Sequence, residues 1–305
     1  MLSLSLFLLA LMVDKGLQKS RNAYFASWND LYSSKINADL LVMGSSRAEF
    51  HISPKILDST LSLNSYNLGL SAWHFDMQYA RFRIYLQHNC KPKYIIQNVD
   101  IYGFSKRLDV VDSPQFLPYI QDTILQKTIL GHKGEFDFYQ RNIPLLKYKS
   151  QQGIALEGFF NFIGFANFYD TTSKYKGYKA NNYTWNNDFE TFKKRFPNGA
   201  KYKFDKEVKR QFNEFLAFCK RENIKVFLVY APEYYEVQPY YKNKNELINL
   251  CNESVKKYGC HFLDYSKNRL CYDRNYFYNS QHLNKRGAEL FSLDLGNKIK
   301  MLLDK

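Results

Sequence analysis

The stretch DLLVMGSSR, residues 39–47, decides the fold that this sequence predicts. Its apolar run, Leu40 to Met43, is short, uninterrupted and closed by a glycine, which is typical of a strand buried on both faces of a parallel sheet. Gly44 allows the chain to leave the strand through a sharp turn, and a serine directly after such a turn projects over the end of the sheet. The stretch therefore predicts a central strand and, directly after it in the sequence, a candidate catalytic serine.

Strand and helix patterns continue outward from this stretch. Short apolar runs at 65–68 and 94–99 predict two further strands, and apolar residues at helical spacing predict a helix over 73–88 between them. This order predicts a strand–helix–strand unit with a right-handed crossover. The alternation returns near the C-terminus, where the predicted elements are a helix at 204–222, a strand at 224–230, a helix at 245–258, a strand at 261–263 and a helix from 285. Five strands with interposed helices predict an α/β protein with a doubly wound, mainly parallel five-stranded sheet.

The middle of the chain, 105–203, does not follow this alternation. It is rich in Phe, Tyr, Asn and Lys and contains no repeat. A segment of this length inside a compact domain either folds separately or serves a function, so we interpret it as a large inserted cap over the sheet edge, with a purely structural subdomain as the alternative. The predicted organisation is an N-terminal hydrophobic segment and linker at 1–30, the first part of the α/β domain at 31–104, the cap at 105–203 and the second part at 204–305.

The N-terminal segment LSLSLFLLALMV, residues 2–13, is apolar. A membrane-spanning helix needs about 20 apolar residues and the apolar part of a signal peptide about 7–15. No basic residue precedes the segment and no clear cleavage site follows it. We favour an export signal or a membrane anchor, which predicts a cell-envelope protein that associates with the membrane through its N-terminus; a buried or frayed helix is the alternative.

The chain has 305 residues, of which 45% are hydrophobic and 17% aromatic, and this composition excludes a wholly disordered protein. A mean hydropathy of −0.47 excludes a polytopic membrane protein. Lys and Arg number 43 against 29 Asp and Glu, a net charge of +14, but they are spread along the chain rather than gathered in a stripe. We therefore expect no nucleic acid partner and interpret the charge as a solvated surface, or as attraction to an acidic glycan or lipid surface.

Metal and cofactor motifs are missing from the sequence. Its five cysteines form no CxxC pair, so no disulfide framework is predicted. Its histidines and cysteines are not clustered, and no glycine-rich phosphate loop is present. The sequence thus predicts chemistry carried by protein side chains alone.

Three short polar segments are placed where such chemistry can occur. Gly44-Ser45-Ser46 follows the first strand, Asn67-Leu68-Gly69 ends the second, and Asn279 to His282 lies beyond the last strand. Because ligands of open α/β sheets bind at the carboxyl ends of the strands, we expect these segments to meet at one edge. Asn98 and Asp100 end the third strand on one shared face, so either can reach the same cleft.

This arrangement resembles the SGNH (GDSL-like) serine hydrolase and acyltransferase superfamily, particularly the bacterial cell-envelope branch that modifies acyl groups of polysaccharides. The resemblance covers about 39–100 and 224 to the C-terminus. It implies a flavodoxin-like three-layer fold, with Ser46 as the nucleophile and His282 as the general base of acyl-ester chemistry that runs through a covalent intermediate.

The resemblance also implies roles for the groups around this pair. The backbone N–H groups of Ser46 and Gly69 are expected to stabilise the oxyanion, with the Asn98 side chain as an additional donor. Arg47 is expected to orient the loop of Ser46 or to meet an anionic part of the substrate, and a surface ion pair is the alternative.

Asn279 departs from the family pattern, which has an aspartate at this position as the partner of the histidine. In the serine-protease triad the Asp-to-Asn change costs about 10⁴ in kcat because it favours the wrong histidine tautomer. Asparagine nevertheless partners the histidine of Cys–His enzymes, and Asp273 is an alternative acid. The sequence leaves this point open.

The sequence is therefore compatible with two functions. The first is an enzyme that cleaves or transfers an O-acyl group, expected to be acetyl, on a cell-envelope carbohydrate, with a membrane acyl-donor protein as a further partner in the case of transfer. The second is a glycan-binding or polysaccharide-assembly protein that has kept the fold and lost efficient catalysis, which the asparagine at 279 motivates.

Overall fold

A computed structural model describes residues 2–165 and 174–304 of the chain. Its main sheet contains β1 (Leu40–Met43), β2 (Ser65–Asn67), β3 (Tyr94–Asn98), β6 (Lys225–Tyr230) and β7 (His261–Asp264). These strands are all parallel and lie in the order β2-β1-β3-β6-β7. The five predicted strands are confirmed, and their order is the flavodoxin-like one.

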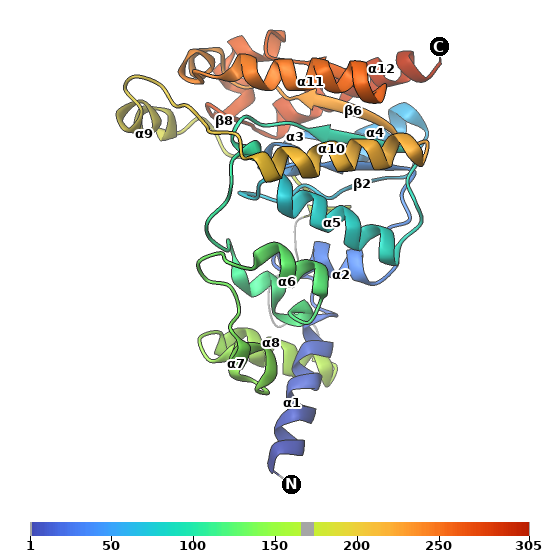
Figure 1. Ribbon diagram of the computed structural model, residues 1–305, viewed down its shortest axis with the longest axis vertical. Coiled ribbons are helices and arrows are strands. Elements are labelled where there is room, and N and C mark those ends of the chain that lie inside the picture. Colours follow the sequence, from blue (N-terminus) through green and yellow to red (C-terminus); the bar gives the residue numbers. More distant parts are fainter. Residues whose placement is uncertain (1, 166–173, 305) are drawn as a thin grey trace. The chain divides into compact units, whose positions relative to one another are not determined.

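Helices cover both faces of this sheet (Figure 1). One face carries α3 (Ser46–His51), α4 (Pro54–Leu61) and α12 (Lys285–Leu303), and the other carries α5 (Phe75–His88), α10 (Lys206–Arg221) and α11 (Lys244–Tyr258). The predicted three-layer α/β fold is thereby confirmed. The short helices α3 and α4 were not predicted, because polar residues and Pro54 interrupt the apolar pattern between the first two strands.

The core beneath α3, α4 and α12 forms because alternate residues of each strand face the same side of the sheet. Its strand residues are buried and aliphatic or aromatic, and the helices add a matching apolar stripe; the cluster includes Leu40, Val42, Ile96, Phe227, Val229, Ile52, Leu57, Phe291, Leu295 and Ile299. This packing fixes the start of α3, directly behind β1, relative to α12.

The chain divides into two compact units, each folded around its own contacts. A sheet unit comprises 37–81, 90–106 and 174–305, and a helical unit comprises 1–36, 82–89 and 107–173. The division falls within α5, after Arg81. Besides the other elements above, the sheet unit contains β4 (Lys174–Tyr175), β5 (Tyr178–Lys179), α9 (Asp188–Arg195), β8 (Phe277–Asn279) and β9 (His282–Leu283). The helical unit contains α1 (Leu2–Leu17), α2 (Ala26–Tyr32), α6 (Thr123–Ile129), α7 (Phe138–Asn142) and α8 (Gln152–Phe162).

This division differs from the predicted boundaries of the inserted region, 105–203. Its part from 107 to 165 folds with the N-terminal helices, whereas 174–203 folds with the sheet. The remaining residues, 166–173, lie outside the described part of the chain. The hairpin β4–β5 and helix α9 therefore belong to the unit that carries the predicted site.

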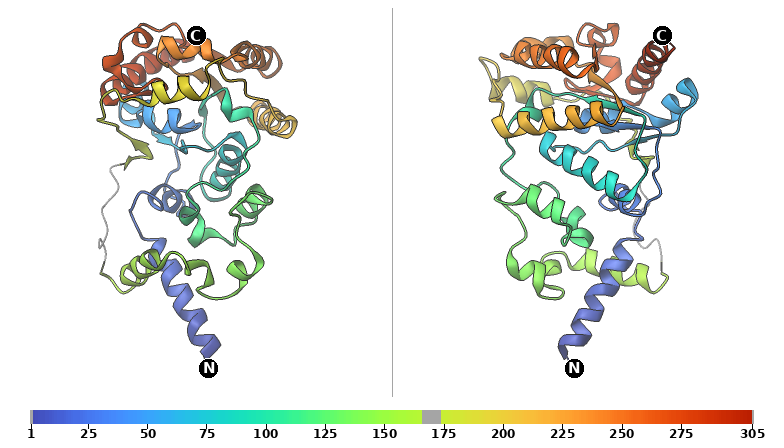
Figure 2. Two further views of the ribbon diagram at one scale, coloured as in Figure 1. Left: turned by 90° about the vertical axis from the view of Figure 1, so that its left-hand side faces the viewer. Right: turned by 45° about the vertical axis from the view of Figure 1, so that its right-hand side comes forward.

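The N-terminal helix α1 packs against α8 within the helical unit (Figure 2). Two glycines lie at the contact: a Cβ on Gly16 would stand 1.6 Å from the carbonyl oxygen of Gly158. Further toward the N-terminus, α1 leaves large apolar side chains exposed; they are Leu4, Leu6, Phe7, Leu8 and Leu11. Among the described residues, no helix is both long enough and apolar enough to cross a membrane.

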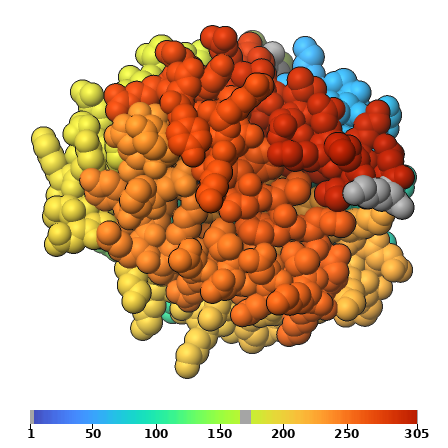
Figure 3. All heavy atoms as spheres, turned by 90° about the horizontal axis from the view of Figure 1, so that it is seen from above, coloured from blue at the N-terminus to red at the C-terminus, as the bar shows by residue number. Residues whose placement is uncertain are grey.

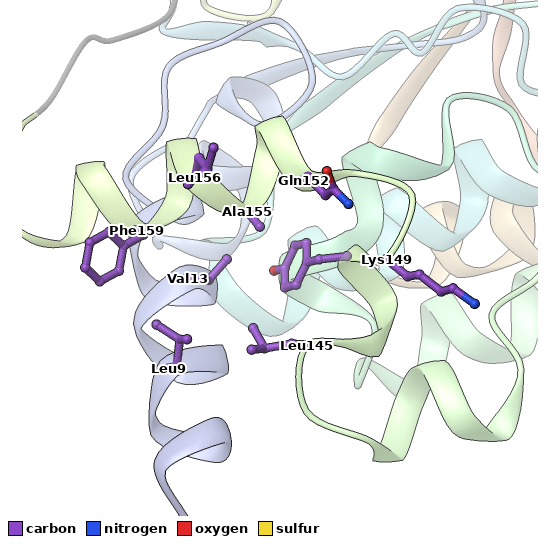
Figure 4. Close-up of a pocket in the computed structure, with 9 residues that line it drawn as sticks. Leu9, Val13, Leu145, Lys149, Gln152, Ala155, Leu156 and Phe159 are labelled. Carbon is purple, nitrogen blue, oxygen red and sulfur yellow. The ribbon is translucent and has the colours of Figure 1, made fainter. Parts of the chain in front are cut away.

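An open apolar pocket of about 610 Å³ lies between α1, α8 and the segment around Leu145 (Figure 4). Leu9 and Val13 line it from α1, and Ala155 and Phe159 line it from α8. The pocket is part of the helical unit and contains none of the residues predicted to carry chemistry.

Candidate active site

The turn after β1 places Ser46 at the carboxyl edge of the sheet. Gly44 has φ +146°, and a Cβ there would stand 2.8 Å from the Cβ of Asn98, so only glycine fits. Ser45 caps α3 by accepting a hydrogen bond from the N–H of Arg47. Ser46 is the first residue of α3, and its N–H therefore has no partner inside the helix. The turn stands between β1 and β3, where the strand order reverses and where ligands of such sheets bind.

The β8–β9 hairpin brings His282 to this serine. The distance between Ser46 Oγ and His282 Nε2 is 2.7 Å, although the two residues lie far apart in the sequence. The half-buried imidazole stacks on the ring of Tyr278, with 5.3 Å between centroids and 12° between planes. Phe50 of α3 contacts it edge-on at 5.8 Å. The ring is thus held in one orientation beside the hydroxyl.

Asn279 holds the other nitrogen of the imidazole. Its Oδ1 accepts from the backbone N–H groups of Gln281 at 3.0 Å and of His282 at 2.9 Å, and lies 3.0 Å from His282 Nδ1. Two backbone donors fix which end of the amide is the oxygen, so Nδ1 must carry the proton. His282 Nε2 then presents its lone pair to Ser46. The tautomer expected to be lost with asparagine is therefore enforced here by the backbone.

The charge state of His282 suits a base. Burial and the nearby Arg47 guanidinium lower the pKa of His282 to about 3, whereas Asp188 acts in the opposite direction. The imidazole is accordingly neutral at neutral pH and free to accept a proton. His51 lies behind it, and burial first, then His282 and Arg47, also lower the pKa of His51. The uncharged His51 Nε2 accepts from the N–H of Leu283 at 3.0 Å, which anchors β9.

Arg47 lies in a buried ion-pair network beneath the turn, and not in the surface ion pair that was the alternative for it. The side chain is buried, its Nη1 lies 3.0 Å from Asp100 Oδ1 and 3.5 Å from Glu233 Oε2, and its Nη2 donates to the carbonyl of Ala231. Asp100 also accepts from the hydroxyl of Ser45. Arg47 therefore ties the turn to the ends of β3 and β6. Its roles in orienting the loop of Ser46 and in meeting an anionic part of the substrate stay predictions.

Gly69 and Asn98 differ from each other in their availability as oxyanion donors. Asn67 folds back over the end of β2, and its Oδ1 accepts from the N–H of Gly69 at 2.8 Å. The N–H that was predicted to stabilise the oxyanion is therefore already engaged in a hydrogen bond. A Cβ on Gly69 would stand 2.4 Å from the backbone nitrogen of Glu49, so the glycine allows a close approach to α3. The Asn98 amide is buried and has no hydrogen-bond partner in the described part of the chain. Asn98 lies against Gly44, since a Cβ on Gly44 would stand 2.8 Å from the Cβ of Asn98.

Sequence reasoning missed the acid next to Asn279. Asp273, the alternative considered, accepts from the N–H of Asn275 and caps a short helical turn instead. Asp188, at the start of α9, accepts from Asn279 Nδ2 at 3.2 Å. The loop before it follows β8, because the N–H of Asn186 donates to the carbonyl of Tyr278 at 2.9 Å. No spacing rule connects Asp188 with a hairpin 91 residues later.

Seen from above, the sheet unit presents mainly C-terminal residues, in orange and red, with the segment around 180–200 in yellow along one edge (Figure 3). This segment contains α9 and the loop that reaches the hairpin of His282. The structure thus combines a flavodoxin-like sheet with a serine directly after β1 and a histidine near the C-terminus, 2.7 Å from each other.

Three solved structures that are similar to this chain carry lipolytic or acylhydrolase descriptions. A G-D-S-L family lipolytic protein from Desulfitobacterium hafniense matches at 14% identity and a TM-score of 0.40, covering 85% of this chain and 97% of that one. An acylhydrolase from Bacteroides fragilis matches at 11% and 0.37, covering 86% and 87%. A GDSL-like lipase from Bacteroides thetaiotaomicron matches at 11% and 0.36, covering 85% and 88%. No protein-family model matches the chain, and no curated protein sequence does.

Proposed function

We propose that this chain is an SGNH-like serine esterase or O-acyltransferase that acts on acyl esters, acetyl esters above all, of a cell-envelope carbohydrate. The observation that carries the proposal is the 2.7 Å contact between Ser46 Oγ and a His282 whose opposite nitrogen is held by Asn279. Nucleophile, base and orienting group within hydrogen-bond reach are the arrangement that acyl transfer through a serine requires.

The reaction follows from these positions. His282 Nε2 takes the hydroxyl proton of Ser46 while Oγ forms a bond to the ester carbonyl carbon. The tetrahedral intermediate collapses, the C–O bond to the sugar breaks, and the leaving alcohol receives the proton from His282. Water, or a hydroxyl of a second sugar, then attacks the acyl carbon while His282 Nε2 takes its proton. The bond between the acyl carbon and Ser46 Oγ breaks, and His282 returns the proton to Oγ, which releases the acid or the new ester. Hydrolysis and transfer differ only in this acceptor.

The negative oxygen of the tetrahedral intermediate is assigned to two hydrogen-bond donors, one in the turn and one beside it. The N–H of Ser46 is free of helix partners, and the buried Asn98 amide is unpaired beside Gly44. Fixed donors of this kind are worth about 10²–10³ in rate for each one removed. Burial of an unpaired amide is costly, and an oxyanion that accepts from Asn98 Nδ2 satisfies the donor end of it.

A carbohydrate substrate is supported by aromatic side chains next to the histidine. Tyr183 is 72% exposed, and its ring lies 6.2 Å from that of Tyr278, which in turn stacks on His282. An exposed tyrosine offers an apolar face with a polar tip to a ring-shaped ligand. The net charge of +14 favours an acidic glycan or an anionic surface nearby.

Cell-envelope location and membrane association are part of the same proposal. The exposed leucines and phenylalanine of α1 support it, since exposed apolar side chains gathered on one helix mark an interaction surface. Sedimentation of the full chain with anionic lipid vesicles, compared with a Leu4→Ser/Phe7→Ser/Leu8→Ser variant, tests this part separately: equal sedimentation of both contradicts it.

The experiment for the enzyme reaction combines a fluorophosphonate serine probe with a panel of acetylated glycans and acetyl esters. Wild type is expected to be labelled on Ser46 and to release acetate, Ser46→Ala to do neither, and a variant of an exposed serine of α4, Ser59→Ala, to match wild type. If labelling persists in Ser46→Ala, Ser46 is not the nucleophile. If the wild type binds glycans but is not labelled and releases no acetate, the protein is a non-catalytic glycan-binding protein and the proposed enzyme function is wrong.

A further inference from the structure

A carboxylate stands directly behind the asparagine that holds the base. Asp188 Oδ2 accepts from Asn279 Nδ2 at 3.2 Å and from Asn186 Nδ2 at 2.9 Å. Within the described residues, no lysine or arginine forms an ion pair with Asp188. Its negative charge is therefore not neutralised by a cation and is directed at the amide of Asn279.

The four groups form a continuous chain of hydrogen bonds. Ser46 Oγ contacts His282 Nε2, His282 Nδ1 contacts Asn279 Oδ1, and Asn279 Nδ2 contacts Asp188. The amide cannot turn over, because two backbone N–H groups hold its oxygen on the imidazole side. Hydrogen bonds in such a series polarise one another, so a carboxylate at one end makes the amide oxygen at the other a stronger acceptor.

We propose that Asp188 is a positioning residue for acyl transfer, which acts through Asn279 and supplies the negative charge that an aspartate at 279 would supply directly. This inference rests on the proposed function. During the reaction His282 becomes an imidazolium, and a negative charge relayed to Nδ1 stabilises that cation. Asn279 supplies the geometry and Asp188 supplies the charge.

The groups that face His282 show why this charge matters. Arg47, behind the turn, opposes protonation of the imidazole, and His51 from α3 packs against it as a neutral ring. Tyr278 and Phe50 contribute uncharged faces. Against these, Asp188 raises the pKa of His282 and is the anion that favours the imidazolium.

A structural role for Asp188 is the rival explanation. It is the first residue of α9, where an acidic side chain stabilises the helix dipole. Glu190 lies in the same first turn, carries the same charge and pairs with Lys193 at 2.7 Å, away from Asn279. Glu190→Gln is therefore the matched control, since it removes one acid from the same helix start without touching the hydrogen-bond chain.

The test measures kcat, KM and the pH dependence of kcat/KM on an acetyl ester for full-length variants. Asp188→Asn is expected to lower kcat about tenfold with KM unchanged, equivalent to one pKa unit at His282, and to move the acidic limb of the profile to lower pH. Glu190→Gln is expected to stay within about twofold of wild type. Equal behaviour of the two variants overturns the inference.

A double-mutant cycle with Asn279→Asp separates charge from shape. In wild type the new carboxylate faces Asp188 across the present 3.2 Å contact, so repulsion between like charges cancels the benefit and kcat does not rise. In Asp188→Asn the same change is expected to restore kcat by about tenfold or more, because the charge now sits on the histidine partner. The same effect of Asn279→Asp in both backgrounds contradicts the inference. Failure of the proposed function is recognised separately, by unchanged activity of Ser46→Ala.

Discussion

The two partners of the serine–histidine pair are held in opposite ways. Ser46 sits on a turn fixed by buried charges, with Arg47 tied to Asp100 and Glu233 beneath it. His282 sits on a short hairpin at the surface, and its support runs through Asn279 to the exposed Asp188. The support of Ser46 is thus buried charge, whereas the support of the His282 imidazole ends at an exposed carboxylate.

This difference separates stability from chemistry. A buried charge that loses its partner costs several kcal/mol, so changes beneath Ser46 act first on folding. An exposed hydrogen bond contributes little to folding, so changes behind His282 act on proton transfer while the fold survives. Variants beneath Ser46 are therefore expected to lower the free energy of unfolding, and variants behind His282 are expected to lower kcat.

The largest effect is expected from His282→Ala. Without the base, Ser46 keeps its place but loses the group that accepts its proton, so kcat/KM is expected to fall by on the order of 10²–10⁴. Esterase assays measure the loss of kcat/KM, and urea denaturation of the same sample measures the free energy of unfolding. His88→Ala, a change in the helical unit, is the control. Activity within tenfold of wild type contradicts the role of the base.

Asn98→Ala is expected to lower kcat by about 10² through loss of an oxyanion donor. Because the amide has no partner in the described part of the chain, its removal leaves no unpaired group behind and the free energy of unfolding is expected to change by less than about 1 kcal/mol. An unaltered kcat assigns the oxyanion to other donors.

Arg47→Met tests the Ser46 side. It leaves Asp100 and Glu233 buried beside each other, and the expected loss is about 3–5 kcal/mol in the free energy of unfolding. Arg210→Met removes an exposed arginine that pairs with two glutamates on α10, and it is expected to leave the free energy of unfolding nearly unchanged. The contrast between them is read from urea denaturation. Comparable losses in both variants argue against the buried network.

The sequence predicted the turn of Ser46 better than the contacts that support either residue of the pair, for a physical reason. A buried parallel strand and its glycine turn are local patterns, so residues 39–47 sufficed for the position of Ser46. The ion pairs of Arg47 and the contact of Asp188 join segments distant in sequence and depend on how loops close. Burial of Arg47 was missed because arginines are rarely buried unless paired, and its partner Glu233 has no sequence signature.

The pH dependence of stability tests the environment of His282. The folded-state pKa of about 3 lies below the value of 6.5 for a free histidine, so the unfolded chain binds more protons between these limits. Stability is therefore complete above about pH 6.5 and falls toward pH 3, by up to about 1.4 kcal/mol per pH unit for this group. Urea denaturation at about pH 7, 6 and 5 is expected to show a smaller slope for His282→Gln than for wild type. Identical slopes contradict the lowered pKa.

Tyr183→Ala is expected to have the smallest effect and to act on substrate alone. The tyrosine is exposed and reaches His282 only through the ring of Tyr278, so kcat and stability are expected to stay nearly constant. Loss of its ring removes about 1 kcal/mol of contact with a sugar, a KM increase of roughly fivefold on acetylated glycans, with none on small acetyl esters. Tyr272→Ala, at another exposed tyrosine of the same unit, controls for loss of an aromatic surface. A KM that rises equally on small esters, or equally in both variants, assigns the sugar contact elsewhere and leaves the serine–histidine pair unaffected.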